Sequence, residues 1–346
     1  MRARLRQGMS GGMQEQNSLT DKVTPLALGA HVTAACFLGP TPVFALGDGA
    51  VVILAADGER RIAAHPDAAI LAACVAGGRL ITGGDDGRVV ATAAKGESEE
   101  IANEKGRWID ALAGRDDGAM AWAAGKQVRA RDAKGEVKSW SAPSSVRGLA
   151  YAPKGYRLAI AHYNGASLWF PNAAAAPEFF EWKGSHLDVT LSPDGRFLVT
   201  SMQENMLHGW RIADGKHMRM TGYPAKPRSL SWSHDGNWLA TSGADACIVW
   251  PFQGKDGPMG KPPRECAVRS SKITQVAFHP TTLIVAVGYD DGWAMLARLS
   301  DGAELLVRRP AEGDAAAITA LAWDERGKKL LFGADDGAAG VLDLPG

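Results

Sequence analysis

Four charged residues recur at similar intervals along the sequence, and together they could form a binding surface. Asp110, Arg147, Asp188 and Arg228 follow one another at intervals of 37 to 41 residues and alternate in sign. If each occupies the same place in a repeated unit, the four side chains meet around one centre. They can then pair with one another, which contributes little at a surface, or bind a peptide or loop that carries both signs.

Three further residues stand beside these positions, at the start of predicted strands: Trp108, His186 and Lys272. Aromatic and arginine side chains are enriched at the centres of protein interfaces. We therefore treat all seven residues as candidate contacts with a partner. Ion pairing between neighbouring repeats is the alternative interpretation of the charged ones, and the sequence does not separate the two.

Signatures of metal or phosphate chemistry are missing from the sequence. It contains no G-x-x-x-x-G-K-[ST] and no H-E-x-x-H. The D-D-G triplets at Asp85–Gly87, Asp290–Gly292 and Asp335–Gly337 supply loop carboxylates, but not with the spacing of a calcium loop. The eight histidines lack zinc-ligand spacing. We expect no catalytic residue, metal or cofactor.

Composition narrows the classes of partner and location. Hydrophobic residues make up 46% of the 346 residues, which suits a folded chain. The 38 basic and 38 acidic residues balance, which argues against nucleic acid despite the basic start at Arg2, Arg4 and Arg6. No stretch reaches the length of a membrane helix, and the N-terminus lacks the apolar core of a secretion signal. We expect a cytoplasmic protein.

The first 22 residues and the cysteines carry no structural signal of their own. Residues 1–22 are polar and contain glycine, which predicts a disordered tail. The four cysteines stand far apart without a C-x-x-C pair, and they are expected to be free buried thiols: Cys36, Cys74, Cys247 and Cys266.

The rest of the chain is built from an internal repeat. Similar segments begin near residues 32, 70, 109, 146, 187, 227, 273 and 318, at intervals of 37 to 46 residues. In SLSWS and TQVAF the apolar side chains fall on every second residue, which indicates β-strands rather than helices. Glycine and aspartate separate the strands, as at Ser192–Gly195 and Ser233–Gly236, which predicts tight hairpins.

These repeats resemble the WD-repeat family of β-propellers, although most of the signature dipeptides are missing. The family's third-strand Trp, turn Asp, first-strand His and second-strand Ser/Thr have counterparts here: Trp169, Trp210 and Trp250; Asp48, Asp86, Asp245, Asp291 and Asp336; His31 and His186, with His65 slightly displaced; Ser201 and Ser242. No single repeat has all four, so the resemblance implies the architecture with an incomplete hydrogen-bonded tetrad.

The predicted fold is an all-β, closed β-propeller over residues 23–346. Eight blades of four antiparallel strands are expected, with seven as the alternative because the repeat at Ile109 has weak β character. The last repeat ends at VLDL without a fourth strand, and VTPLAL near the N-terminus can supply it. Such closure removes an open sheet edge.

The resemblance implies a non-catalytic scaffold that binds a partner protein or peptide on the narrow face of the propeller. The alternative is a cofactor- or metal-binding propeller enzyme, because the turn Ala213–Lys216 (ADGK) resembles turns of eight-bladed quinoprotein propellers. Those enzymes typically act outside the cytoplasm. The partner's identity and the oligomeric state do not follow from the sequence.

Overall fold

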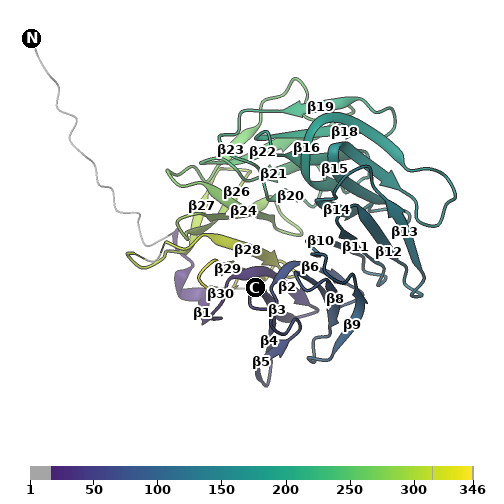
Figure 1. Cartoon of the computed structure of the whole chain (residues 1–346). Helices are drawn as coiled ribbons and strands as arrows, with labels where there is room; N and C mark the ends of the chain where they lie inside the picture. Colours follow the sequence, from purple (N-terminus) through teal and green to yellow (C-terminus); the bar gives the residue numbers. More distant parts are fainter. Residues whose placement is uncertain (1–16, 314, 345–346) are drawn as a thin grey trace, which may run out of the picture.

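A computed structural model describes residues 17–313 and 315–344, and these form a ring of twisted antiparallel sheets around a central channel (Figure 1). Within these residues, Thr20–Lys22 form a 3₁₀ turn, η2. The strands that open the repeats lie nearest the channel, and the later strands of each repeat lie progressively further out (Figure 1). The prediction of an all-β propeller is confirmed.

The first three repeats form four-stranded meanders in which each strand pairs with the next along the chain. The first contains β2 (Val32–Leu38), β3 (Thr41–Leu46), β4 (Ala50–Ala55) and β5 (Gly58–Ala63). The second contains β6 (Ile70–Ala76), β7 (Arg79–Gly84), β8 (Arg88–Thr92) and β9 (Ser98–Asn103). The third contains β10 (Ala111–Gly114), β11 (Met120–Ala124), β12 (Gln127–Arg131) and β13 (Val137–Ser141).

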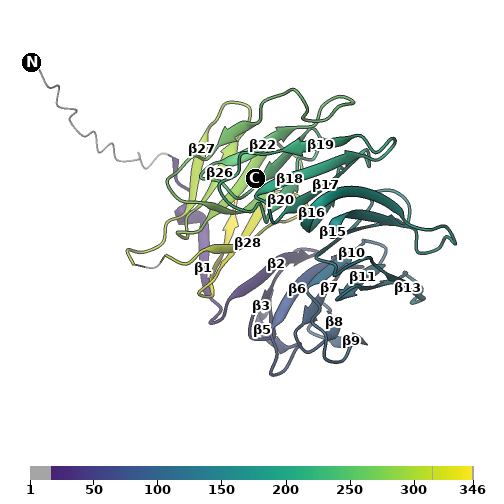
Figure 2. The same cartoon turned by 45° about the horizontal axis from the view of Figure 1, so that its top comes forward.

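The fourth and fifth repeats are joined in one six-stranded sheet. Its strands are β14 (Gly148–Tyr151), β15 (Leu158–Trp169), β16 (Glu178–Leu191), β17 (Phe197–Met202), β18 (Met206–Arg211) and β19 (His217–Met220). Figure 2 shows β15 and β16 as long ribbons. The first half of β16 pairs with β15 and its second half pairs with β17, so one strand serves both repeats.

The expected count of eight separate blades is therefore wrong. The described strands form seven sheets, in line with the alternative count. The change of repeat falls near Gly184, whose φ of +129° bends the backbone, and β16 (Glu178–Leu191) continues through this residue without a break. The chain bends there instead of breaking, and the pairing changes partner within a continuous strand.

The remaining strands complete the ring. One sheet contains β20 (Leu230–Trp232), β21 (Trp238–Thr241), β22 (Cys247–Pro251) and β23 (Arg264–Cys266). The next contains β24 (Ile273–Phe278), β25 (Ile284–Tyr289), β26 (Ala294–Arg298) and β27 (Glu304–Arg308). The last contains β28 (Ile318–Trp323), β29 (Lys329–Ala334), β30 (Ala338–Asp343) and, on its outer edge, β1 (Val23–Ala27).

The two ends of the described chain close the ring. Strand β1 pairs antiparallel with β30, so that Val23 lies opposite Leu342 and Ala27 opposite Ala338. The prediction that VTPLAL supplies the missing strand is confirmed. Of the expected tail at residues 1–22, residues 1–16 lie outside the described residues. Ser18 forms a bridge with Leu306, and the Leu19 N–H donates to the Leu306 carbonyl over 2.7 Å.

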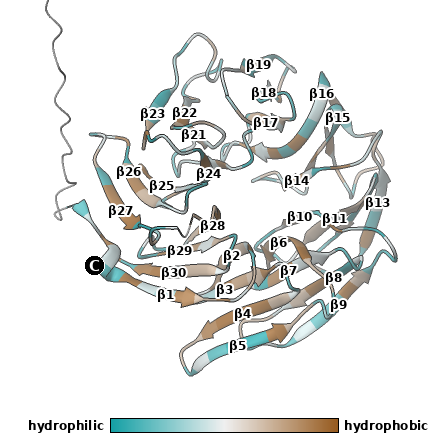
Figure 3. Ribbon diagram, turned by 60° about the vertical axis from the view of Figure 1, so that its left-hand side comes forward, coloured by the Kyte–Doolittle hydropathy of each residue, from teal (hydrophilic) through white to brown (hydrophobic). Residues whose placement is uncertain are grey.

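The sheets are held together by apolar side chains that the strand alternation turns toward the neighbouring sheets. The second and third strands are the most buried, as in β3 and β4, whereas the outer strand β5 is largely exposed. Figure 3 shows the same gradient, with hydrophobic central strands and hydrophilic segments along β5. Because each layer of apolar side chains is shared by two sheets, the ring is stabilised as a whole.

Glycine in the turn between second and third strands is required by the neighbouring repeat. Gly337 has a φ of +85°, and a Cβ placed on it would lie 2.8 Å from the carbonyl oxygen of Ala30. Gly87 has a φ of +81° and a similar contact with the Arg107 carbonyl. The prediction of glycine-dependent hairpins is confirmed, and the turns also set the distance between repeats.

Polar side chains of the WD type are present in some repeats, in altered combinations. His65 Nδ1 lies 3.0 Å from Asp86 Oδ2, and its Nε2 lies 2.9 Å from Thr82 Oγ1. In the sixth repeat the Trp250 indole N–H donates to the Tyr223 hydroxyl over 2.6 Å, and this hydroxyl lies 2.7 Å from Thr241 Oγ1. A tyrosine thus takes the place of the histidine.

The second-strand residues of these networks differ from those matched by sequence. Thr200, and not Ser201, lies 2.7 Å from His186 Nδ1, and Thr241 rather than Ser242 joins the Trp250 network. The sequence comparison assigned Ser201 and Ser242 to the tetrad, one residue after the threonines that form these hydrogen bonds. Side chains alternate across a sheet, so a shift of one residue moves a hydroxyl from the space between sheets to the channel side.

Candidate functional site

A β-bulge near the start of the first strand sets which side chains face the channel. In the first repeat Val32 pairs with Leu46 and Ala34 with Ala45, which leaves Thr33 unpaired. The same shift leaves Leu71, Thr274 and Thr319 unpaired in their repeats. Bulges re-aim a side chain, and these residues form a ring at the channel.

In three repeats the residue of this ring is a threonine whose hydroxyl is hydrogen-bonded to the neighbouring repeat. Its hydroxyl donates to a main-chain carbonyl of the next first strand over 2.6 to 3.0 Å: Thr274 to Ile318, Thr319 to Val32, and Thr33 to Ile70. These bonds connect consecutive repeats across the closure of the ring. The hydroxyls of these three threonines therefore already have hydrogen-bond acceptors within the fold.

Asp110 and Arg147 occupy the same ring position in the third and fourth repeats. The Arg147 guanidinium donates to Asp110 Oδ2 over 2.7 Å, with the Arg147 side chain about half exposed. The expected ion pair between neighbouring repeats is therefore present here, and both residues also line the channel. The two charges compensate each other, which leaves a neutral segment of the channel wall.

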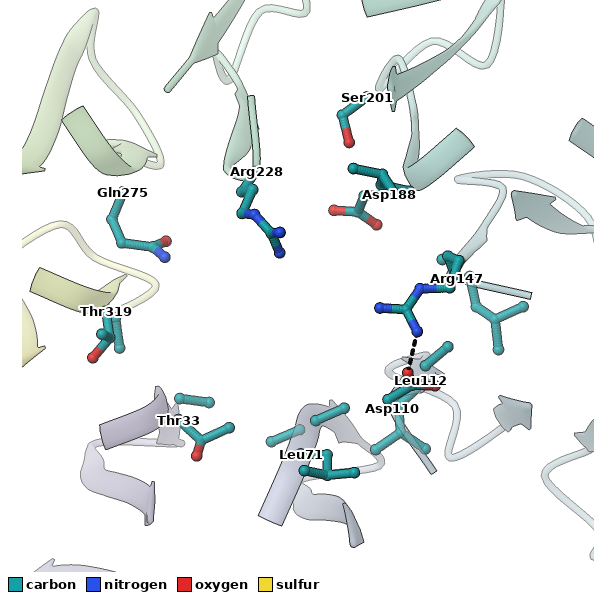
Figure 4. A pocket seen from close by; sticks show the side chains of 18 of the residues that line it. Thr33, Leu71, Asp110, Leu112, Arg147, Asp188, Ser201, Arg228, Gln275 and Thr319 are labelled. Carbon is teal, nitrogen blue, oxygen red and sulfur yellow. Dashed lines mark hydrogen bonds and ion pairs between the residues drawn. The ribbon is translucent and has the colours of Figure 1, made fainter. Parts of the chain in front are cut away.

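The ring surrounds a cavity of about 660 Å³. Figure 4 shows Asp188 and Arg228 pointing into it, with the Asp110 and Arg147 pair at one side. Its lining combines polar groups with small apolar residues from the first strands: Thr33, Leu71, Asp110, Leu112, Arg147, Asp188, Ser201, Arg228, Gln275 and Thr319 among others.

Asp188 lies one residue further along its strand than the sequence comparison suggested. In the fifth repeat the bulge falls between His186 and Asp188, so the unpaired residue equivalent to Thr33 is Leu187. Asp188 is paired with Ser201 on β17 and lies at the level of Ala34 and Ala72 in their repeats. The carboxylate therefore projects from a deeper level of the channel than Asp110.

The fold surrounds the Asp188 carboxylate closely without giving it a cation. Its Oδ1 accepts the Val189 N–H over 2.8 Å. A Cβ on Gly148, in the preceding repeat, would lie 2.9 Å from that oxygen, so only glycine leaves room. This packing shields part of the half-buried carboxylate from water, and the desolvation raises the pKa of Asp188 to about 6.

Ser201 places a hydroxyl beside this carboxylate. The residue is 1% exposed, and its Oγ has no hydrogen-bond partner among the described residues. In several other repeats the two residues at this level are small and apolar: Ala34 with Ala45, Ala72 with Gly83, Ala111 with Ala123, Gly148 with Ala161, and Ala320 with Gly333. The seventh repeat has Gln275 opposite Gly288 at this level, and the sixth has Ser242 next to Thr241, so the carboxylate is what distinguishes the fifth repeat.

Arg228 is the ring residue of the sixth repeat. Its main-chain N–H donates to Ser242 Oγ, which fixes the backbone. Its guanidinium forms no ion pair within the described chain. It lines the first cavity and also a second one of about 620 Å³, which Lys226 and Lys272 share. The lysine and arginine side chains that line the second cavity are basic, and Pro224 and Ile273 add apolar surface to it.

The other predicted contact residues lie in different surroundings. Trp108 is 66% exposed, in the loop that leads into the third repeat. Lys272 lines the second cavity. His186 is fully buried, and its ring nitrogens lie within hydrogen-bond distance of Thr200 and the Trp182 carbonyl. Its surroundings are those of a supporting residue behind the channel wall.

Known proteins share both the repeat and the ring. The model of the family "WD domain, G-beta repeat" matches residues 217–250, which contain the Tyr223, Thr241 and Trp250 network. WD repeat-containing protein 1-B of Xenopus laevis is 30% identical over 111 residues, which are 31% of this chain and 18% of that protein. This chain is a β-propeller that contains a WD repeat.

Two further similarities show how far this relation extends. WD repeat-containing protein 1-A of Xenopus laevis is 29% identical over 159 residues, which are 43% of this WD-repeat chain and 25% of that protein. The matches therefore span a quarter or less of these relatives. The crystal structure of the computationally designed Ika8 protein superposes with a TM-score of 0.75 at 19% identity, over 92% of this chain and 98% of that one, and shows the fold alone.

A second cluster in the WD-repeat ring gathers imidazole rings at the outer side of the fifth repeat. His208 is fully buried between aromatic rings, with centroid distances of 4.0 Å to Trp182 and 4.8 Å to Trp210. Neither of its ring nitrogens has a partner among the described residues, and burial lowers the pKa of His208 to about 3. It is a neutral core residue at physiological pH.

The described residues of this propeller contain neither a metal-binding cluster nor a membrane-spanning helix. No group of three or more His, Cys, Asp or Glu side chains is arranged to hold a metal ion. No described helix has the length and hydropathy to cross a membrane. All four cysteines are free thiols, and Cys36 and Cys74 occupy equivalent half-buried places in neighbouring sheets, where burial raises the pKa of each to about 12.

Proposed function

We propose that this WD-repeat propeller is a non-catalytic scaffold that binds a partner protein or peptide on the face where the first strands begin. WD-repeat propellers generally bind protein partners, and charged side chains of this chain, among them Asp188, Arg228 and Lys272, line the cavities at that face. The proposed contacts are Trp108, Asp110, Arg147, Asp188, Arg228 and Lys272. We leave His186 out of this set because its side chain is fully buried.

The observation that carries the proposal is the pair of adjoining cavities at the channel. Both are lined by Arg228, Gln275, Thr33 and Thr319, so a bound segment can extend from one into the other. The charged side chains Arg228 and Lys272 have no recorded ion pair within the described chain. Charges that the fold leaves without a partner favour association with a complementary surface.

Trp108 adds an apolar contact to this polar face. The Trp108 side chain exposes 66% of its surface, and contact of apolar surface with water is unfavourable. Burial against a partner would gain about 25 cal/mol for each Å² of apolar surface removed from water. Tryptophan is also enriched among residues that dominate interface energies. We place Trp108 at the edge of the binding face, next to Asp110 in sequence.

A pull-down from the native cell tests this proposal. The wild-type protein is compared with the triple variant Trp108→Ala/Arg147→Asp/Arg228→Asp. We expect the variant to lose specific partners that the wild type retains. Arg298→Asp is the matched control, because Arg298 is a half-exposed arginine paired with Asp301 on an outer turn, far from the cavities in the fold.

Recovery of the same partners by the triple variant and the wild type would remove this face from consideration. Far-ultraviolet circular dichroism of each protein checks that the propeller is folded. An absorbance band of a quinone, or a stoichiometric metal in the purified protein, would overturn the non-catalytic assignment. Because all four thiols are free, we place the scaffold in the cytoplasm, where thiols stay reduced, and cell fractionation tests this.

A further inference from the structure

The fifth repeat holds two polar groups that the fold leaves unsatisfied at one point of the channel. The Asp188 carboxylate accepts a single recorded hydrogen bond, from Val189, and the buried Ser201 hydroxyl has no partner in the described chain. The two residues are opposite each other on β16 and β17. Figure 4 shows both side chains at the cavity wall, with the Ser201 oxygen directed toward Asp188.

We propose that Asp188 and Ser201 form a binding site for one cationic group, an ammonium or a guanidinium, that enters the channel. The carboxylate supplies the charge and two acceptor oxygens, and the serine hydroxyl supplies a further acceptor. A charged N–H donor bonded to a carboxylate is among the stronger hydrogen bonds in proteins. The site deepens the proposed function, on which it rests where a partner's side chain supplies the cation.

The chemistry of the wall favours a cation over an anion or a neutral group. A half-buried carboxylate without a compensating charge is unfavourable for folding, and a bound cation reduces this cost. An anion at the same place would be repelled. At this level four other repeats have alanine or glycine and the seventh has the neutral Gln275, so these repeats present no second carboxylate that would compete for the cation.

The neighbouring charges leave this place open. Arg147, before β14, is bonded to Asp110, so it is already compensated. Arg228, before β20, points into the cavity from the sixth repeat but forms no recorded ion pair with Asp188. On the same strand His186 is buried and burial lowers its pKa, so it is neutral at physiological pH. Arg228 remains free to bind a carboxylate next to the incoming cation.

Two sources can supply such a cation: a free amine or guanidine, or a lysine or arginine side chain of a partner. Calorimetric titration of the full chain separates them. The small probes are N-acetyl-L-arginine amide and N-acetyl-L-lysine amide, with N-acetyl-L-citrulline amide as the neutral isostere. The peptide probes are acetylated, amidated pentapeptides with a central arginine, flanked either by alanine or by aspartate.

We expect saturable binding of a cationic probe at about pH 7.5, at least tenfold tighter than the citrulline analogue. Asp188→Asn should weaken the binding about tenfold or more, and Ser201→Ala should weaken it less. Asp301→Asn, on an outer turn, is the charge-matched control and should bind as the wild type does. Preference for the aspartate-flanked peptide identifies a partner side chain with Arg228 as its second contact, and preference for the small probes identifies a free ligand.

Binding should also weaken as the pH falls through 6, because protonation of Asp188 removes the charge that attracts the cation. The site is refuted if no cationic probe binds at millimolar concentration, or if Asp188→Asn binds as well as the wild type. These results are independent of the pull-down. A cation that binds while no partner is lost by the triple variant supports the site and not the scaffold face, and the reverse result supports the face alone.

Discussion

The carboxylate of Asp188 lies directly against the backbone of Gly148 in the preceding repeat. A Cβ on residue 148 would come within 2.7 Å of the Asp188 Cα and 2.9 Å of its Oδ1. The absence of a side chain at one residue thus allows a charged side chain at the other. This contact joins the fourth and fifth repeats at the channel wall.

Gly148→Ala should therefore disturb the packing between these two repeats and lower the stability of the protein. The closest atom to the added methyl is a backbone atom, which cannot rotate away, so we expect a loss of about 1–3 kcal/mol in the free energy of unfolding, measured by urea denaturation. Gly47→Ala is the control, because its Cβ would meet only the side chain of His31 at 3.3 Å. Equal losses for the two variants would contradict the packing described here.

Asp188→Asn should make the protein more stable at neutral pH. Because the folded state raises the pKa of Asp188 from 3.8 to about 6, the ionised carboxylate disfavours folding above that pH. The amide removes this effect, and we expect a gain of about 1–2 kcal/mol near pH 7.5, after allowance for solvent in the channel. The gain should shrink as the pH falls through 6 and disappear near pH 3, below both pKa values of Asp188, where the carboxyl is protonated in both states.

Urea denaturation of the wild type and Asp188→Asn at both pH values measures this difference. A variant that is less stable than the wild type at neutral pH would show that the carboxylate has a partner that stabilises the fold. Asp290→Asn is a suitable control for loss of one negative charge, since Asp290 lies in an exposed turn and accepts the Lys272 N–H.

Acid should destabilise the propeller through its buried imidazoles. The folded state lowers the pKa of His208 from 6.5 to about 3, so its contribution to stability is present above pH 6.5 and is lost as the pH falls toward 3. Burial also lowers the pKa of His65, His162, His186 and His279. Each such group contributes up to about 1.4 kcal/mol per pH unit in this window.

His208→Phe tests this origin of acid sensitivity. Phenylalanine keeps the stacking with Trp182 and loses no recorded hydrogen bond, since neither nitrogen of His208 has a partner among the described residues. The melting temperature of the variant should fall less steeply than that of the wild type between about pH 6.5 and 4. An identical pH profile for the two proteins would assign the acid sensitivity to other groups.

The tyrosine that replaces the histidine in the sixth repeat should contribute to stability through its hydroxyl. Tyr223→Phe leaves the Trp250 N–H without its acceptor inside the sheet, and a buried unsatisfied donor costs about 1–3 kcal/mol. Thermal and urea unfolding measure the loss. Tyr163→Phe is the control, because the Tyr163 side chain is exposed and should leave the stability unchanged. Comparable losses in both variants would contradict this assignment.

The architecture followed from the sequence because repeat period, strand alternation and glycine turns all depend on neighbouring residues. The pairing of β1 with β30 was predictable for the same reason, since VLDL lacks an outer partner within its own repeat. The number of sheets was not, because it depends on whether β16 bends or breaks near residue 184. Both outcomes satisfy the same pattern of apolar residues.

The candidate site was predictable at the level of residues and not of contacts. Asp110, Arg147 and Arg228 do line one channel, as their spacing indicates. The bulge at Leu187 moved Asp188 one place along the strand, and no residue type in that segment signals a bulge. Ser201 was assigned to the tetrad because Thr200 beside it is chemically equivalent, and only the direction of the side chain separates their roles.

The seam of the ring also determines the order in which the chain can be completed during synthesis. Val23–Ala27 leaves the ribosome early, and its hydrogen-bonding partner, Ala338–Asp343, is translated about 300 residues later. Throughout that interval the first strand is an unpaired edge open to other nascent chains. Pro25, in the middle of that strand, lacks an amide hydrogen and so makes it a poor template for aggregation until its own partner arrives.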